Sequence, residues 1–255
     1  MQSDPRPIRG WALVLPILVT VLVGAGLGGF VVFENIRESE RIGTADDIGA
    51  EYLSSVASFR LRVSKALDGA DQDDPAALRA ALEVAIAEPP VLGEADPTAA
   101  ERSSTYTEAR RVSETLLDPY VELDATLKHA IGARRFVDAA RDVLQLRATD
   151  YVDGVLIDDS TQVRRSLIPA FVAGRNEFAA VPVPTGAEEA ARLVRAALQE
   201  VIDKATALAD SIDANRAYTF TYGESFRVAA VAVDDFVAQL DGDLTEALNA
   251  VHDLR

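Results

Sequence analysis

An uninterrupted apolar segment near the N-terminus is the clearest pattern in the sequence. No charged residue occurs from Gly10 to Phe33, and residues 11–33 read WALVLPILVTVLVGAGLGGFVVF. A helix of this length rises about 35 Å, which is enough to cross a hydrocarbon core of about 30 Å. Trp11 and Phe33 lie near its two ends, where aromatic side chains commonly meet the membrane interface. The pattern predicts a transmembrane helix over residues 11–33.

A cleaved signal peptide is the main alternative for this segment. Val23, Gly24 and Ala25 form an acceptable small-residue cleavage site. The apolar residues nevertheless resume after this site and continue to Phe33, which exceeds the apolar region of about 7–15 residues found in signal peptides. We therefore expect the segment to be retained as an anchor in the lipid bilayer.

Glycines inside the predicted span allow two further interpretations. Gly24, Gly26 and Gly29 match the spacing of a dinucleotide-binding loop, but no strand precedes them as that motif requires. Gly24 with Gly28, and Ala25 with Gly29, instead place small residues four positions apart. This spacing lets two membrane helices approach closely, so these four residues are candidates for transmembrane helix packing and for a homo-oligomer.

Basic residues flank the predicted span on both sides and leave its orientation open. Arg6 and Arg9 precede the span, whereas Arg37 and Arg41 follow it. The usual signal-anchor arrangement places a short N-terminal tail in the cytoplasm and the long domain outside. We therefore expect a single-pass protein of the cell membrane with an extracytoplasmic C-terminal domain. Its parts would be a tail (1–10), the span (11–33), a juxtamembrane linker (34–43) and an acidic helical domain (44–255).

Apolar residues after the span recur with the period of a helix. In residues 194–212 and 226–251 they follow one another at alternating steps of three and four. These narrow apolar seams predict an all-α fold: an antiparallel helical bundle with long, coiled-coil-like helices. Helix starts are predicted from capping side chains at five places: Thr44 with Asp47, Asp74 before Pro75, Asp96 before Pro97, Asp159 with Gln162, and Thr185 with Glu188. Pro119 and Gly132 are expected to kink or divide a long helix.

One segment departs from the helical pattern. Residues 218–222 alternate aromatic and threonine residues, as strands do. We favour a continued helix whose rings fill the core, and an extended link with rings packed on the bundle is the alternative. In either form, Tyr218, Phe220 and Tyr222 are candidate partner-binding residues.

Composition and charge exclude several classes of function. The chain has 255 residues, of which 49% are hydrophobic and 26% charged, with a net charge of −16. Nucleic-acid binding needs a basic stripe, and none occurs, so we expect no nucleic-acid partner. The absence of cysteine excludes disulfides, thiolate metal sites and thiol chemistry.

No combination of residues predicts catalysis, a metal or a cofactor. The chain has two histidines, His129 and His252, which are expected to be solvated or to cap helices. Ser225 follows Gly223 and Glu224 without the second glycine of a nucleophile elbow. The acidic loops 68–74 and 150–159 could attract calcium but lack EF-hand spacing. Arginine pairs at 110–111, 134–135 and 164–165 are expected to form solvated ion pairs.

Two functional hypotheses follow for this chain. The first is a non-enzymatic scaffold or protein-interaction module of the cell envelope, held in the bilayer by residues 11–33 and bound to a protein partner. The second is an extracytoplasmic ligand-sensing bundle that signals through a separate partner protein. A cavity between helices would favour the sensor.

Overall fold

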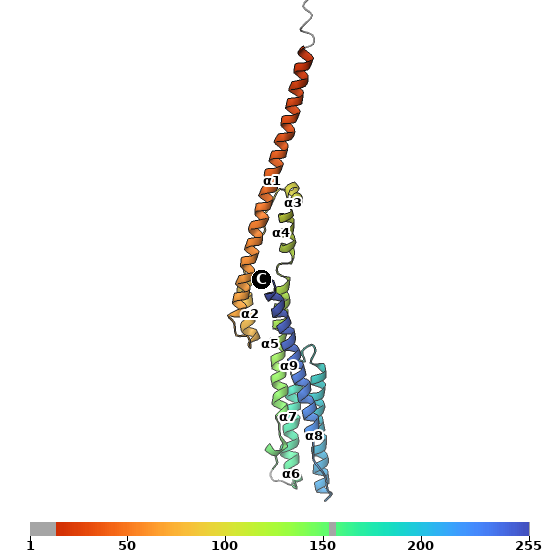
Figure 1. Ribbon diagram of the computed structural model, residues 1–255. Coiled ribbons are helices and arrows are strands. Elements are labelled where there is room, and N and C mark those ends of the chain that lie inside the picture. Colours follow the sequence, from red (N-terminus) through yellow and green to blue (C-terminus); the bar gives the residue numbers. More distant parts are fainter. Residues whose placement is uncertain (1–13, 153–156, 255) are drawn as a thin grey trace, which may run out of the picture. The chain divides into compact units, whose positions relative to one another are not determined.

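The computed structural model describes the backbone of residues 14–152 and 157–254, and within these ranges it describes side chains from residue 37 onward (Figure 1). Nine α-helices lie in the described ranges: α1 (Val14–Asp68), α2 (Pro75–Ile86), α3 (Pro97–Arg102), α4 (Ser104–Thr115), α5 (Asp118–Leu144), α6 (Ser160–Gln162), α7 (Ile168–Ala179), α8 (Glu188–Asp213) and α9 (Gly223–His252). A 3-10 turn, η1 (Ala148–Asp150), and a π-helical turn, η2 (Val163–Leu167), complete the described elements. These residues contain no strand, which confirms the all-α prediction.

Helix α1 continues without a break through the position where a new helix was predicted. The capping start at Thr44 is wrong, because the Thr44 hydroxyl donates to the Glu40 carbonyl at 2.9 Å inside the helix. The residues expected to form a linker, 34–43, are therefore helical. Within the described part of the chain, no helix combines the length and apolarity needed to cross a membrane. The predicted span, residues 11–33, lies outside the residues whose side chains are described.

The chain forms two compact units. Unit 1 comprises residues 1–59 and 89–116, and its described part contains α3, α4 and α1 as far as Phe59. Gly49 lets α1 approach the start of α4, because a Cβ atom there would lie 2.9 Å from backbone atoms of Thr105 and Tyr106. The Ser103 hydroxyl donates to Asp46 of α1 at 2.6 Å and accepts from the Tyr106 amide at 2.9 Å. Ser103 thus caps α4 and ties it to α1.

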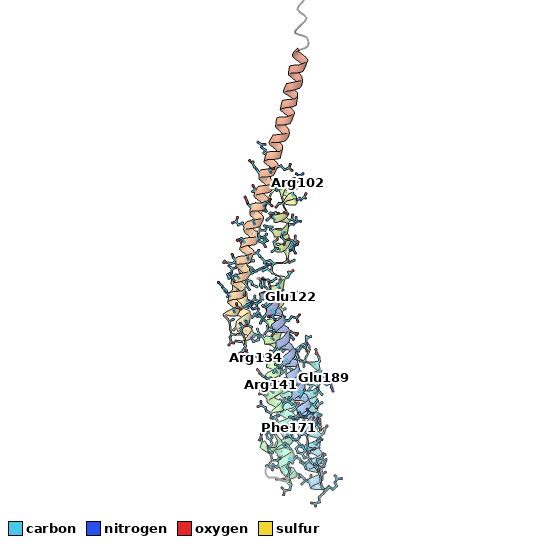
Figure 2. All side chains as sticks on the ribbon, viewed as in Figure 1. Arg102, Glu122, Arg134, Arg141, Phe171 and Glu189 are labelled. Atoms are coloured by element: carbon cyan, nitrogen blue, oxygen red, sulfur yellow. The ribbon has the colours of Figure 1, made fainter. Side chains whose placement is uncertain are left out.

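Unit 2 comprises residues 60–88 and 117–255 and contains the helical bundle. Helices α5, α7, α8 and α9 pack together, and α2 packs on α5 (Figure 1). Phe171 of α7 lies inside this bundle (Figure 2), where its ring meets those of Tyr151, Tyr222 and Phe226 at centroid distances of 6.1–6.3 Å. Pro119 lies in the first turn of α5, whereas Gly132 lies within that continuous helix and does not divide it.

Side-chain caps account for three of the predicted helix starts. Asp74, Asp96 and Asp159 each accept hydrogen bonds from backbone amides at the starts of α2, α3 and α6. The predicted cap at Thr185 is wrong, since α8 begins at Glu188 after Ala187, which provides no side-chain cap. Gly186 adopts a positive φ of 87° in this turn.

The favoured helical form of residues 218–222 is also wrong, because α8 ends before them. Asn215 adopts a left-handed φ of 54°, the Arg216 amide donates to the Ser211 carbonyl, and the Asn215 amide donates to the Ile212 carbonyl. These bonds form a Schellman motif that ends the helix. The segment is a non-helical link between α8 and α9, as in the alternative prediction.

Candidate functional site

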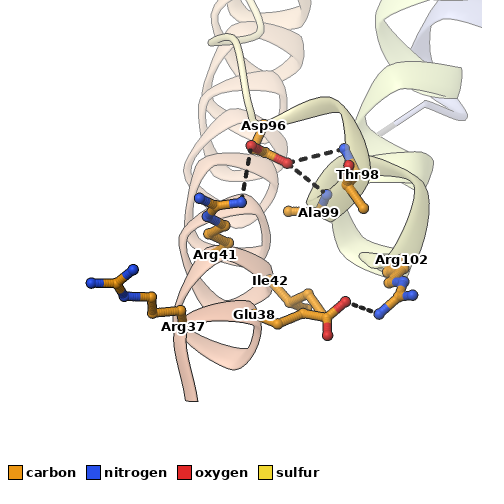
Figure 3. A pocket seen from close by; sticks show the side chains of 8 residues that line it. All are labelled: Arg37, Glu38, Arg41, Ile42, Asp96, Thr98, Ala99 and Arg102. Carbon is orange, nitrogen blue, oxygen red and sulfur yellow. Dashed lines mark hydrogen bonds and ion pairs between the residues drawn. The ribbon is translucent and has the colours of Figure 1, made fainter. Parts of the chain in front are cut away.

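The first candidate site is an open pocket of unit 1, formed by α1, α3 and Asp96 at the start of α3 (Figure 3). Its volume is about 350 Å³. Eight residues line it: Arg37, Glu38, Arg41, Ile42, Asp96, Thr98, Ala99 and Arg102. The lining therefore includes three guanidinium groups and two carboxylates, and the Arg37 side chain extends away from Arg102 (Figure 3). Guanidinium groups suit the binding of an anion.

The two carboxylates of this pocket already have partners within the protein. Glu38 forms an ion pair with Arg102. Asp96 Oδ1 accepts from the amides of Thr98 at 3.0 Å and Ala99 at 3.2 Å, while its Oδ2 lies 3.8 Å from Arg41 Nη1. That last distance exceeds a hydrogen bond, so the Arg41 guanidinium, which is well exposed, retains donors for a ligand.

Asp46 of α1 and Ser103, which precedes α4, join two helices of unit 1. The hydrogen bond from the Ser103 hydroxyl, with a second from Thr105, lowers the pKa of the Asp46 carboxyl below its usual value. Ser103 is almost fully buried at 1% exposure. The pair therefore fixes α4 on α1 and with it the segment that carries Arg102.

The second candidate site is the aromatic segment of unit 2. The Tyr222 hydroxyl accepts from the Ala148 amide at 2.8 Å, and the Phe220 and Tyr222 rings lie 5.3 Å apart against the core. Tyr218 is 40% exposed. Two of the three predicted partner-binding side chains are thus engaged inside the protein, whereas Tyr218 remains partly exposed to solvent.

A Ser–His–Asp cluster is a feature that the sequence analysis missed. His252 Nδ1 lies 3.2 Å from the Ser64 hydroxyl, and His252 Nε2 lies 3.6 Å from Asp68 Oδ1. Ser64 is 1% exposed, so a substrate could not reach its hydroxyl in this arrangement. The cluster joins the end of α9 to α1 within unit 2. Ser64 and His252 lie 188 residues apart in the chain, and no local sequence pattern predicts a contact between them.

An open pocket of about 610 Å³ lies beside this cluster in unit 2. Its lining includes Leu244 and Leu248 of α9, together with the carboxylates of Asp73 and Asp241. Apolar and acidic groups together suit a ligand that carries both a positive charge and an apolar part.

The other residues singled out from the sequence either form ion pairs within the protein or lie outside the described residues. Arg111 pairs with Glu108, Arg134 with Asp74, and Arg164 with Asp210 and Asp213, as expected for solvated ion pairs. In the described residues, no group of three or more histidine or acidic side chains is placed to hold a metal ion. The small residues predicted to pack membrane helices, Gly24, Ala25, Gly28 and Gly29, lie outside the residues whose side chains are described.

Comparison with known proteins adds no relative: no family, no curated protein and no solved structure matches this chain.

Proposed function

We propose that this chain is a single-pass membrane protein that displays a non-enzymatic helical interaction module outside the cytoplasm, as a scaffold or partner-binding protein of the cell envelope. The continuity of helix α1 is the observation that supports this proposal most directly. Its helical backbone begins inside the apolar segment and continues to Asp68, contributing residues to both compact units. One continuous helix would thus connect a membrane anchor directly to the folded domain.

Tyr218 supports a partner-binding role for unit 2. Its neighbours Phe220 and Tyr222 are packed against the core, so the exposed ring is held on an ordered backbone. Tyrosine is enriched among the residues that dominate the affinity of protein interfaces. A ring that is presented in this way loses little conformational entropy when a partner covers it.

Site-specific photo-cross-linking in intact cells tests this role. We expect a photoreactive amino acid at position 218 to cross-link to one defined envelope protein, and the same probe at exposed Val84 of α2 to give no such product. The Y218S variant should lower recovery of that protein at least about fivefold, because an aromatic contact residue is worth about 1–2 kcal/mol. Identical cross-linking from positions 218 and 84 would contradict the assignment.

The pocket lined by Leu244, Leu248, Asp73 and Asp241 favours the second candidate function, a ligand sensor. A small cationic ligand that raises the melting temperature of the full-length protein, and no longer does so in the D241N variant, would support the sensor over the scaffold.

A further inference from the structure

We propose that His252 is a pH-dependent latch: its imidazole holds the end of α9 on α1 more tightly when it carries a proton. The contacts of this latch with Ser64 and Asp68 all lie within unit 2. The proposal goes beyond the proposed function, because it does not require α1 to be a membrane anchor.

The two ring nitrogens of His252 contact α1 at positions one turn apart. Nδ1 lies 3.2 Å from the Ser64 hydroxyl, and Nε2 lies 3.6 Å from Asp68 Oδ1. A serine hydroxyl can donate to an unprotonated ring nitrogen and accept from a protonated one, so the Ser64 contact suits both states of the ring. The contact with Asp68 is an ion pair only when the ring is protonated. A proton therefore adds an attraction to α1 without removing the hydrogen bond.

Carboxylates surround His252 on its own helix and on the neighbouring segments. Besides Asp68 of α1, Asp73 before α2 and Asp241 of α9 line the same open pocket as the imidazole. Asp253 follows His252 directly in the chain. Because opposite charges attract, these groups favour the protonated ring.

Two basic residues of α1 lie near this contact in the chain. Arg60 is one turn before Ser64, and its charge acts on the Tyr120 hydroxyl of α5. Lys65 lies in the last turn of α1 with its side chain exposed to solvent, where salt screens its charge. The carboxylates therefore outnumber the cations around the imidazole.

The position of His252 at the end of α9 acts in the same direction. It is the last residue of that helix, where the carbonyl ends of the backbone favour a cation. Its side chain is 30% exposed, so protons reach it from solvent. Histidine side chains ordinarily exchange a proton between about pH 5 and 8. An attraction that requires the protonated ring is present at the acidic end of this range and is lost as the pH rises.

The latch also bears on the open pocket of about 610 Å³ in unit 2. His252 lines this pocket together with Leu244 and Leu248 of α9. We expect this wall of the pocket to be held most firmly at acidic pH and to open locally more often at alkaline pH.

Hydrogen exchange of the full-length protein in detergent, measured by mass spectrometry, tests the latch. Exchange at pH 5.5 and at pH 8.0 is corrected for the intrinsic rate at each pH, and the protection of residues 244–252 is divided by that of residues 194–209 in α8. We expect this ratio to be about threefold or more higher at pH 5.5 in the wild type, and nearly equal at the two pH values in H252Q, whose side chain gains no proton. The matched control H129Q removes the other histidine of the chain, in α5, and should keep the wild-type difference.

A second variant, D68N, separates the ion pair from the histidine itself. It keeps the imidazole and the Ser64 contact, and it should reduce the pH difference at least about twofold. A wild-type ratio that is equal at the two pH values, or higher at pH 8.0, would overturn the proposal. So would a pH difference that persists in H252Q or is unchanged in D68N. Circular dichroism checks that each variant is folded, and the wild type and D68N decide the matter if H252Q is not.

Discussion

Asp124 of α5 joins two helices of unit 2 through its carboxylate. It accepts from Arg79 Nε of α2 at 2.8 Å and lies 2.5 Å from Lys128 Nζ one turn along α5. The hydrogen bond from Lys128, and after it the one from Arg79, lowers the pKa of this carboxyl below its usual value. A carboxyl whose pKa is lower in the folded state stabilises the fold above its unfolded pKa of about 3.9, and this contribution is lost as the pH falls through that value toward the folded pKa.

We therefore expect D124N to lower the free energy of unfolding by about 1 kcal/mol at neutral pH and by progressively less below about pH 4. Urea unfolding of the full-length protein in detergent, followed by circular dichroism between pH 3 and 7, measures this difference. The control D138N changes an exposed aspartate on the same helix and should have little effect at either pH. A difference for D124N that is independent of pH would contradict the ion-pair explanation.

The tertiary contacts of single side chains were the feature least predictable from the sequence. His252 was expected to be solvated or to act as a cap, yet it contacts Ser64 and Asp68 of α1. Tyr218 and Tyr222 belong to one alternating pattern, but only the structure shows that the Tyr222 hydroxyl is used by the Ala148 amide. Such contacts depend on tertiary packing between distant segments, which a local pattern does not encode.

Helix boundaries were predictable wherever a side-chain cap preceded a proline. Asp74 and Asp96 begin α2 and α3 as expected, because proline at the first turn and an aspartate before it act together. The helix start predicted at Thr44 was wrong because a threonine hydroxyl can also donate to the carbonyl four residues earlier inside a helix. The helix end at Asn215 was not predicted from the sequence. Its left-handed conformation ends α8, so the segment that contains Tyr218 is not part of that helix.

The packing of α1 on α4 in unit 1 depends on a residue without a side chain. We expect G49A to destabilise the protein by about 1–3 kcal/mol, since its Cβ would lie 2.9 Å from the backbone of Thr105 and Tyr106 and the helices would have to separate. G43A is the matched control on the same helix, where a Cβ meets nothing within 4 Å. It should stabilise the protein by about 0.5–1 kcal/mol. Thermal unfolding of both variants measures the contrast, and equal effects would contradict the close approach.

At the scale of the whole molecule, the all-helical class and the bundle followed from apolar periodicity, whereas the division into two units did not. The units are interleaved in sequence, because residues 60–88 separate the two segments of unit 1. Periodicity reports which face of a helix is buried but not which helix covers it. The seams of α8 and α9 were visible in the sequence, but their assignment to one unit with α5 and α7 required the structure.

We propose that α1 anchors an extracytoplasmic helical domain in the membrane. The most direct measurement is protease digestion of intact cells whose outer envelope has been permeabilised, with detection of a C-terminal tag on the full-length protein. We expect residues 34–255 to be digested from outside while a cytoplasmic control protein remains intact. Protection of the tag until the membrane is lysed would place the domain in the cytoplasm and contradict the account.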